Sequence, residues 1–186
     1  MATIPDWNAL GLLPPIDPET PTNVERSPYQ VSLTDLVLRF GTSPERKAIL
    51  IGFLKYRAVL HQFGAKEGFQ WLDGSFMEEV EILESRPPRD IDVVSFIHGT
   101  LPEDADAYVE HGAAKTNFSV DSYFVELDEL PPRELTLWSA YWYSMWSHRR
   151  TQAWKGFLQV ELAPTEDAEA LAWLSQTELG GQSESI

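Results

Sequence analysis

The chain has 186 residues, and its 43% of hydrophobic residues are enough for one domain with a well-formed core. Its formal net charge is −15, because 29 acidic residues outnumber 14 basic ones, so long nucleic acid is a disfavoured partner. Cysteine is absent, which excludes disulfides and thiolate metal sites, and no apolar run approaches the 18 residues of a membrane span.

The N-terminal residues 1–28 hold many prolines and show no hydrophobic period, which predicts an extended arm. Trp7, Leu12 and Leu13 are the side chains that could pack this arm across the domain. Residues 1–15 lack the basic region and apolar stretch of a secretion signal, so we expect a cytoplasmic protein without a membrane partner.

Residues 42–63 give the strongest helix prediction in the chain. Thr42 or Ser43 can cap this helix, Pro44 suits its first turn, and Gly64 ends it. A stripe at spacings of three and four is expected to face the core: Ile49, Phe53, Tyr56, Leu60 and Phe63.

Two arginines lie on the same predicted helix, at positions 46 and 57. Charged residues are rarely fully buried, so we expect Arg46 and Arg57 near the surface or turned toward a phosphate site.

The rest of the chain alternates short apolar runs with polar connections, which predicts strands at 69–72, 91–97, 118–127 and 157–162. Further helices are predicted at 133–147 and at 165–179, the latter ended by Gly180-Gly181. This order predicts an α/β (α+β) fold, in which a mixed sheet is flanked by helices. One domain is expected over 29–180, with a frayed tail at 181–186.

Acidic and turn residues form the most informative pattern. A strand that enters Gly74-Ser75 makes a tight turn whose N–H groups and hydroxyl can approach a phosphate. Asp90 and Asp92 are two residues apart, so on a strand they share one face, where Mg²⁺ relieves their repulsion. Asp121, on a further strand, would complete the cluster.

Each element of this pattern also has a simpler explanation. Gly74-Ser75 is a common turn, and aspartates at alternate positions more often mark a solvated strand edge. Asp121 alone could be an ordinary polar position on an amphipathic strand. The hypothesis therefore depends on the order of the elements along the chain.

Gly74-Ser75 followed by Asp90-Ile-Asp92 on a hydrophobic strand resembles the signature of the polymerase-beta-like nucleotidyltransferase superfamily. More narrowly, residues 43–162 resemble a bacterial and phage family of small nucleotidyltransferase-like proteins. The segments that carry the likeness are Arg46, Tyr56-Arg57, Gly68 to Phe76, Asp90 to Asp92, Val120 to Phe124, Arg149-Arg150 and Lys155-Gly156. Residues 76–89 are a departure, because this segment is long for the superfamily.

The resemblance implies that Gly74 and Ser75 hold the triphosphate of an NTP substrate. Asp90, Asp92 and Asp121 would bind Mg²⁺ or Mn²⁺ and form the catalytic cluster. Three basic residues, Arg149, Arg150 and Lys155, would meet the phosphate charge, although a solvated turn explains them equally well.

The activity that the resemblance implies is transfer of a nucleoside monophosphate to a hydroxyl of a protein or small-molecule acceptor. A nucleotide that carries its own Mg²⁺ is less sensitive to the acidic surface than long nucleic acid is. Two alternatives stay open. One is a binding module that works through a protein partner in a toxin–antitoxin or phage-defence pair, and the other is a nucleotide sensor without turnover.

Aromatic residues and histidines give weaker signals. An aromatic group could stack a base, although helical spacing more often indicates core: Trp138, Tyr141, Trp142, Tyr143 and Trp146. The four histidines lack metal-ligand spacing, and His98 is the single histidine for which we consider a catalytic role.

Overall fold

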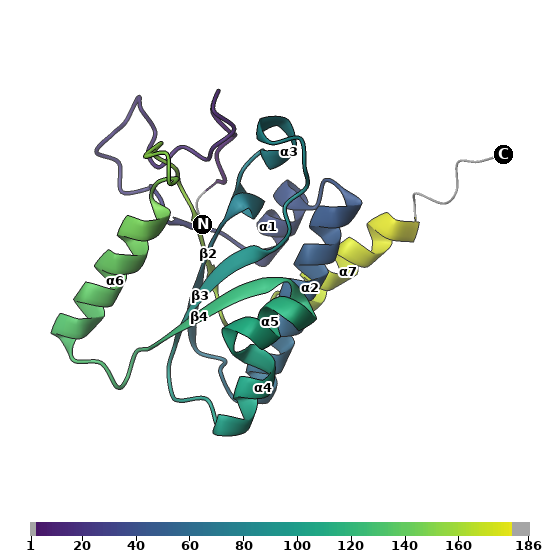
Figure 1. The fold of residues 1–186 in the computed structure, drawn as a ribbon, viewed down its shortest axis with the longest axis vertical. Coiled ribbons are helices and arrows are strands. Elements are labelled where there is room, and N and C mark those ends of the chain that lie inside the picture. Colours follow the sequence, from purple (N-terminus) through teal and green to yellow (C-terminus); the bar gives the residue numbers. More distant parts are fainter. Residues whose placement is uncertain (1–2, 180–186) are drawn as a thin grey trace.

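A five-stranded mixed sheet forms the centre of the computed structural model, which describes residues 3–179 (Figure 1). The predicted tail at 181–186 and the Gly180-Gly181 helix stop lie outside the described residues. The strands are β1 (Tyr29–Gln30), β2 (Gly68–Asp73), β3 (Ile91–Ile97), β4 (Val120–Glu126) and β5 (Leu158–Glu161). Their order is β1-β5-β2-β3-β4, with β2 antiparallel to both neighbours and β4 parallel to β3.

Helices cover the two faces of the sheet unequally (Figure 1). One face packs against α1 (Leu33–Phe40), α2 (Pro44–Gln62), α5 (His111–Phe118) and α7 (Asp167–Leu179). The other face carries α6 (Pro132–Trp146). The remaining short turns are η1 (Ser75–Met77), α3 (Val80–Leu83), η2 (Glu103–Ala105) and α4 (Asp106–Val109). Within residues 3–179, no helix combines the length and apolarity that crossing a bilayer requires.

Side chains alternate between two separate cores, as the pleat of the strands dictates. Leu72 and its register partner Val93 belong to the larger core under α2. Trp71 and Val94, one position away, belong to the smaller aromatic core under Trp142 of α6. Residues on the α6 face of β2, β3 and β4 are therefore those that reach the cleft described below.

The predicted mixed sheet flanked by helices is confirmed. The predicted helix at 42–63 is α2, where the Ser43 hydroxyl accepts a hydrogen bond from the N–H of Arg46. The stripe from Ile49 to Leu60 is buried, and Phe63 is partly buried against it. The four predicted strands are present as β2 to β5, and the two later helices as α6 and α7.

Several short elements were not predicted. In α5, the sequence His111 to Phe118 has no apolar stripe, and Ala114 is its buried residue. The α1 helix is only eight residues long. The Ser32 hydroxyl caps it by accepting a hydrogen bond from the N–H of Asp35. Tertiary packing rather than periodicity fixes such short helices, because an isolated helix of this length is not stable in water.

The expected exposure of Arg46 and Arg57 is wrong, because both side chains are buried. Arg57 donates to Oε1 of Gln70 at 2.7 Å and to Oδ1 of Asp167 at 2.8 Å. It also donates to the backbone carbonyls of residues 161–163, and in this way connects α2 to β2 and to the start of α7. Burial removes water from the guanidinium, and this loss of hydration is offset because all of its N–H donors find partners.

We expect Arg57→Met to lower the free energy of unfolding by about 3–5 kcal/mol, because it leaves Asp167 and several carbonyl groups without their donor. Urea unfolding followed by circular dichroism measures this change. Lys55→Met, at an exposed position of the same helix, is the control and should change stability by less than about 0.5 kcal/mol. Equal stability of the two variants would contradict a structural role for Arg57.

Candidate functional site

Three aspartates stand side by side where β2 ends and where β3 and β4 begin. The antiparallel register pairs Asp73 of β2 with Asp92 of β3, and the parallel register pairs Asp92 with Asp121 of β4. Register partners project from the same face of a sheet, so the three side chains form one carboxylate row. The row lies on the α6 face and lines a cleft of about 910 Å³.

The sequence pattern identified two members of this row and missed the third. Asp73 precedes Gly74, and the sequence analysis gave it no role, because only the pairing of β2 with β3 places it beside Asp92. The sequence itself shows only a carboxylate between the predicted strand 69–72 and Gly74, and this does not reveal which strand pairs with β2.

Asp90 lies just before β3 and outside the row. Its Oδ2 is 2.9 Å from Nζ of Lys115, and the same Nζ is 3.0 Å from Oδ2 of Asp121. One ammonium from α5 therefore joins the two carboxylates, and they raise the pKa of Lys115. Nδ1 of His111, one helical turn earlier, is 2.5 Å from Oδ1 of Asp121.

Asp92 stands among carboxylates. Burial and the charges of Asp73, Asp121 and Asp90 raise its pKa to about 7. Within residues 3–179, no Lys, Arg or His side chain forms an ion pair with Asp92. The central member of the row therefore carries the largest unfavourable interaction.

Asp73 has a cation of its own. Burial raises its pKa to about 6, although Nζ of Lys155 lies 2.9 Å from Oδ2 and opposes the shift. Burial also disfavours the Lys155 ammonium, but the carboxylates of Asp73 and Glu78 outweigh burial and raise its pKa. Oδ1 of Asp73 is buried and has no hydrogen-bond partner in the described part of the chain.

Gly74 turns the chain directly over Asp92. Its φ is +88°, and a Cβ at this position would lie 2.1 Å from Oδ2 of Asp92. Both the backbone conformation and the space therefore require glycine here. Gly74 and Ser75, which begins η1, line the cleft as the predicted phosphate-binding turn would.

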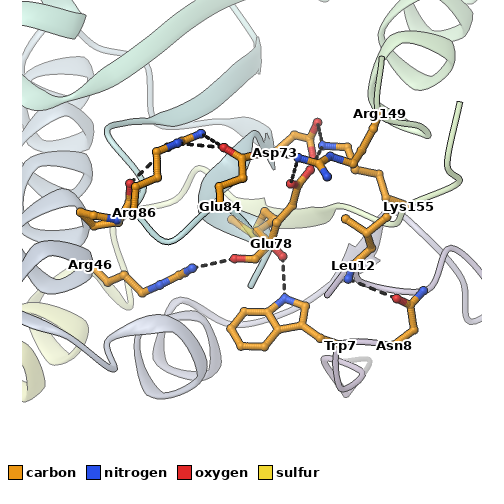
Figure 2. Close-up of polar contacts among 12 residues, drawn as sticks. Trp7, Asn8, Leu12, Arg46, Asp73, Glu78, Glu84, Arg86, Arg149 and Lys155 are labelled. Atoms are coloured by element: carbon orange, nitrogen blue, oxygen red, sulfur yellow. Dashed lines mark hydrogen bonds and ion pairs between the residues drawn. The ribbon is translucent and has the colours of Figure 1, made fainter. Parts of the chain in front are cut away.

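The turn after Gly74 is held from behind by Arg46. Nη1 of Arg46 donates to the carbonyl of Phe76 at 2.7 Å, and Nη2 donates to that of Glu78 at 2.6 Å. Its Nε donates to Glu81 at 2.6 Å, and the indole of Trp7 donates to the carbonyl of Met77 at 2.8 Å. Figure 2 shows Arg46 and Trp7 beside Glu78. Arg46 therefore positions this turn from within the core rather than contacting the cleft.

Basic and acidic side chains lie together where Glu78, Glu84, Arg86 and Arg149 line the cleft. Arg149 lies 2.7 Å from Glu84 and 3.2 Å from Glu78, and Arg86 lies 2.6 Å from Glu84 (Figure 2). Arg150 is exposed and also lines the cleft. The sequence analysis missed Arg86, because the likeness to known motifs does not extend into residues 76–89.

The remaining residues that the sequence analysis singled out lie partly in the core and partly on the surface. His98 lies at the far end of β3 from Asp92 and contacts Asp128 at 2.8 Å, away from the row. Trp142 and Trp146 are buried in the core under α6, whereas Trp138 and Tyr141 are exposed. Tyr123 lines the cleft, and burial together with Asp121 raises its pKa to about 12.

A divalent cation can be tested against these residues. Among residues 3–179, no three His, Asp or Glu side chains are already arranged around a metal position. The donor set nevertheless fits Mg²⁺ or Mn²⁺, since the row offers carboxylate oxygens. Among the described residues, Oδ1 of Asp73 and Oδ1 of Asp121 are buried without a hydrogen-bond partner, and Asp92 has no ion-pair partner.

Comparison with known proteins gives one match. Residues 5–161 match the family described as “Family of unknown function (DUF6932)”. The matched region contains the carboxylate row, the Gly74 turn and the basic residues of the cleft. No curated protein and no solved structure matches the chain.

The raised pKa of Asp92 makes a prediction about stability. Between about pH 4 and pH 7 the folded protein holds a proton on Asp92 that the unfolded chain releases, so this residue lowers stability as pH rises. An asparagine side chain resembles a protonated aspartate, so Asp92→Asn should leave the free energy of unfolding nearly unchanged at pH 4. At pH 8 it should raise the free energy of unfolding by roughly 2–4 kcal/mol.

Urea unfolding of both proteins in EDTA, at pH 4 and at pH 8, measures this difference. Asp104→Asn, in the exposed η2 turn, is the matched control and should show no such dependence. A stability gain for Asp92→Asn that is the same at both pH values would contradict the assignment.

Proposed function

The chain belongs to the DUF6932 family, and we propose that it is a divalent-metal-dependent nucleotidyltransferase. It would transfer a nucleoside monophosphate from an NTP to a hydroxyl of a protein or small-molecule acceptor. The observation that carries this proposal is the row of Asp73, Asp92 and Asp121, which lies directly beneath the Gly74-Ser75 turn in a cleft with a basic wall.

Asp92 and Asp121, with Oδ1 of Asp73, are the groups that would hold Mg²⁺ or Mn²⁺. Asp90 and Lys115 border this set from the α5 side. When bound, the metal would neutralise negative charge on the attacking and leaving oxygens of the transfer. A bound cation would offset the repulsion among these carboxylates, which explains why the cleft holds so many of them.

The Gly74-Ser75 turn and the arginines that line the cleft would bind the phosphates. The backbone N–H groups and the hydroxyl at Gly74-Ser75 can approach a triphosphate closely, because position 74 has no Cβ. Arg149 and Arg86 are now paired with Glu84, and the phosphates would compete with this carboxylate for them. Arg150 adds a further positive charge at the edge of the cleft.

The reaction itself is a displacement at the α-phosphorus. The acceptor oxygen bonds to phosphorus as the bond to the bridging oxygen breaks, and pyrophosphate leaves. The proton of the acceptor hydroxyl passes to a carboxylate of the row.

The acceptor is constrained by charge. With a net charge of −15, the protein repels long polyanions, and the basic side chains of the cleft are largely paired with acids. A hydroxyl on a protein or a small molecule meets no such repulsion. We therefore favour these acceptors over RNA or DNA ends.

A second candidate function is a binding module with a protein partner, in the setting of a toxin–antitoxin or phage-defence pair. It is favoured by the outer face of α6, where Leu137, Trp138, Tyr141 and Met145 are exposed. A hollow of about 500 Å³ lies between Glu134, Leu137, Trp138 and Tyr141. On this alternative the cleft would bind an NTP without turning it over, or would bind none.

Replacement of Asp92 or Asp121 by Asn should lower label transfer from α-³²P-labelled NTPs to an acceptor by at least about 10³-fold, because each change removes a metal ligand. Circular dichroism should show that both variants fold. Asp104→Asn is the control and should transfer label like the wild type. Transfer that persists in Asp92→Asn would contradict the proposal.

The pairing of Arg149 with Glu84 makes a separate prediction for nucleotide affinity. Arg149→Ala should weaken Mg²⁺–ATP binding by about 10-fold, and Glu84→Gln should tighten it by a few fold, because it removes the charged partner of Arg86 and one of the two carboxylates that Arg149 contacts. Isothermal titration calorimetry measures both changes. Weaker binding by Glu84→Gln would contradict competition between this carboxylate and the phosphates.

A further inference from the structure

Lys115 is the one side chain that bridges Asp90 to the carboxylate row among the described residues. Its Nζ lies 2.9 Å from Oδ2 of Asp90 and 3.0 Å from Oδ2 of Asp121. A cation that contacts two carboxylates, one just before β3 and one on β4, occupies the kind of place that a divalent ion takes between such groups. Lys115 is exposed along much of its side chain, so its stem reaches this position from outside the core.

The fold delivers Lys115 to this place through a tight connection. The α5 helix ends at Phe118, Ser119 adopts a left-handed conformation, and β4 begins at once with Val120. The chain therefore reverses so sharply that Lys115 returns over Asp121, six residues later. His111 lies one turn earlier on α5 and contacts the other oxygen of Asp121.

The end of the row at Asp73 has a different set of contacts from the end at Asp121. The buried Lys155 contacts Oδ2 of Asp73 and Oε1 of Glu78, and Oδ1 of Asp73 is buried without a hydrogen-bond partner among the described residues. Asp92, in the middle, has no ion-pair partner among the described residues. The cleft side of the row therefore has carboxylate oxygens available to a ligand, whereas on the side facing α5 the Lys115 ammonium already lies between Asp90 and Asp121.

We propose that the Lys115 ammonium takes the place of a second divalent cation, so that this site binds one metal ion rather than two. That ion would lie on the cleft side, at Asp73, Asp92 and Asp121, while Lys115 holds Asp90 against Asp121. The inference rests on the proposed function, because it presumes that the row binds a divalent cation.

A fixed ammonium differs from a metal ion in what it can do. It stabilises negative charge and donates hydrogen bonds, but it cannot serve as a Lewis acid for a bound oxygen. It also stays in place when the divalent concentration falls. Lys115 is thus a positioning residue that orients Asp90 and Asp121 and supplies a permanent charge.

Mn²⁺ binding without nucleotide tests the proposal, by electron paramagnetic resonance of free Mn²⁺ during titration. The wild type should bind one Mn²⁺ per chain, and Lys115→Met should bind two, because it frees the oxygens of Asp90 and Asp121. Lys115→Gln is a second variant with the same expectation, and circular dichroism verifies that each variant folds. Lys55→Met, at an exposed position of α2, is the control and should bind one.

The outcomes separate the inference from the function on which it rests. Two Mn²⁺ ions in the wild type, or one ion both in the wild type and in the Lys115 variants, would overturn the role of Lys115 but leave the metal-dependent function standing. No Mn²⁺ binding in any of these proteins would overturn both. Binding only in the Lys115 variants would support the cation-like role of Lys115 and overturn the single cleft-side site.

Discussion

Repulsion among the carboxylates around Asp92 is the interaction on which the rest of this site depends. Two strand registers, one antiparallel and one parallel, force Asp73, Asp92 and Asp121 into adjacent positions on one face. In a partly buried setting such like charges are costly, which is why burial and its neighbours raise the pKa of Asp92 to about 7. The two lysines at the ends of the row are the structural response to this cost.

Distant parts of the chain combine to hold that arrangement. Lys155 reaches Asp73 because its N–H bonds to the carbonyl of Ser147, and the next residue, Gly156, donates to Leu13 of the N-terminal segment. From the opposite side, Arg46 fixes the turn that passes over Asp92. The core thus supplies the rigidity that a set of mutually repelling groups cannot supply, as a preorganised site requires.

Local patterns were enough to predict some elements and not others. The α2 helix and strand β3 follow from strong periodicity and β-branched residues, and Asp92 and Asp121 follow from their places on such strands. Asp73 depends on a register between strands, and Lys115 on a helix without an apolar stripe, so neither could be predicted from spacing. Burial of Arg46 and Arg57 also escaped prediction, because the carbonyl groups that satisfy them come from distant loops.

A purely structural explanation accounts for some of these residues but not for all. Lys155, Asp73 and Glu78 form a buried ion-pair cluster that can simply connect the sheet to the loop after β2. Asp92 has no comparable explanation: it makes no ion pair within the described residues, it destabilises the fold when ionised, and it forces glycine at position 74. A residue that costs stability at the floor of a cleft is understandable where a bound ligand offsets that cost, and the divalent cation that we propose would be such a ligand.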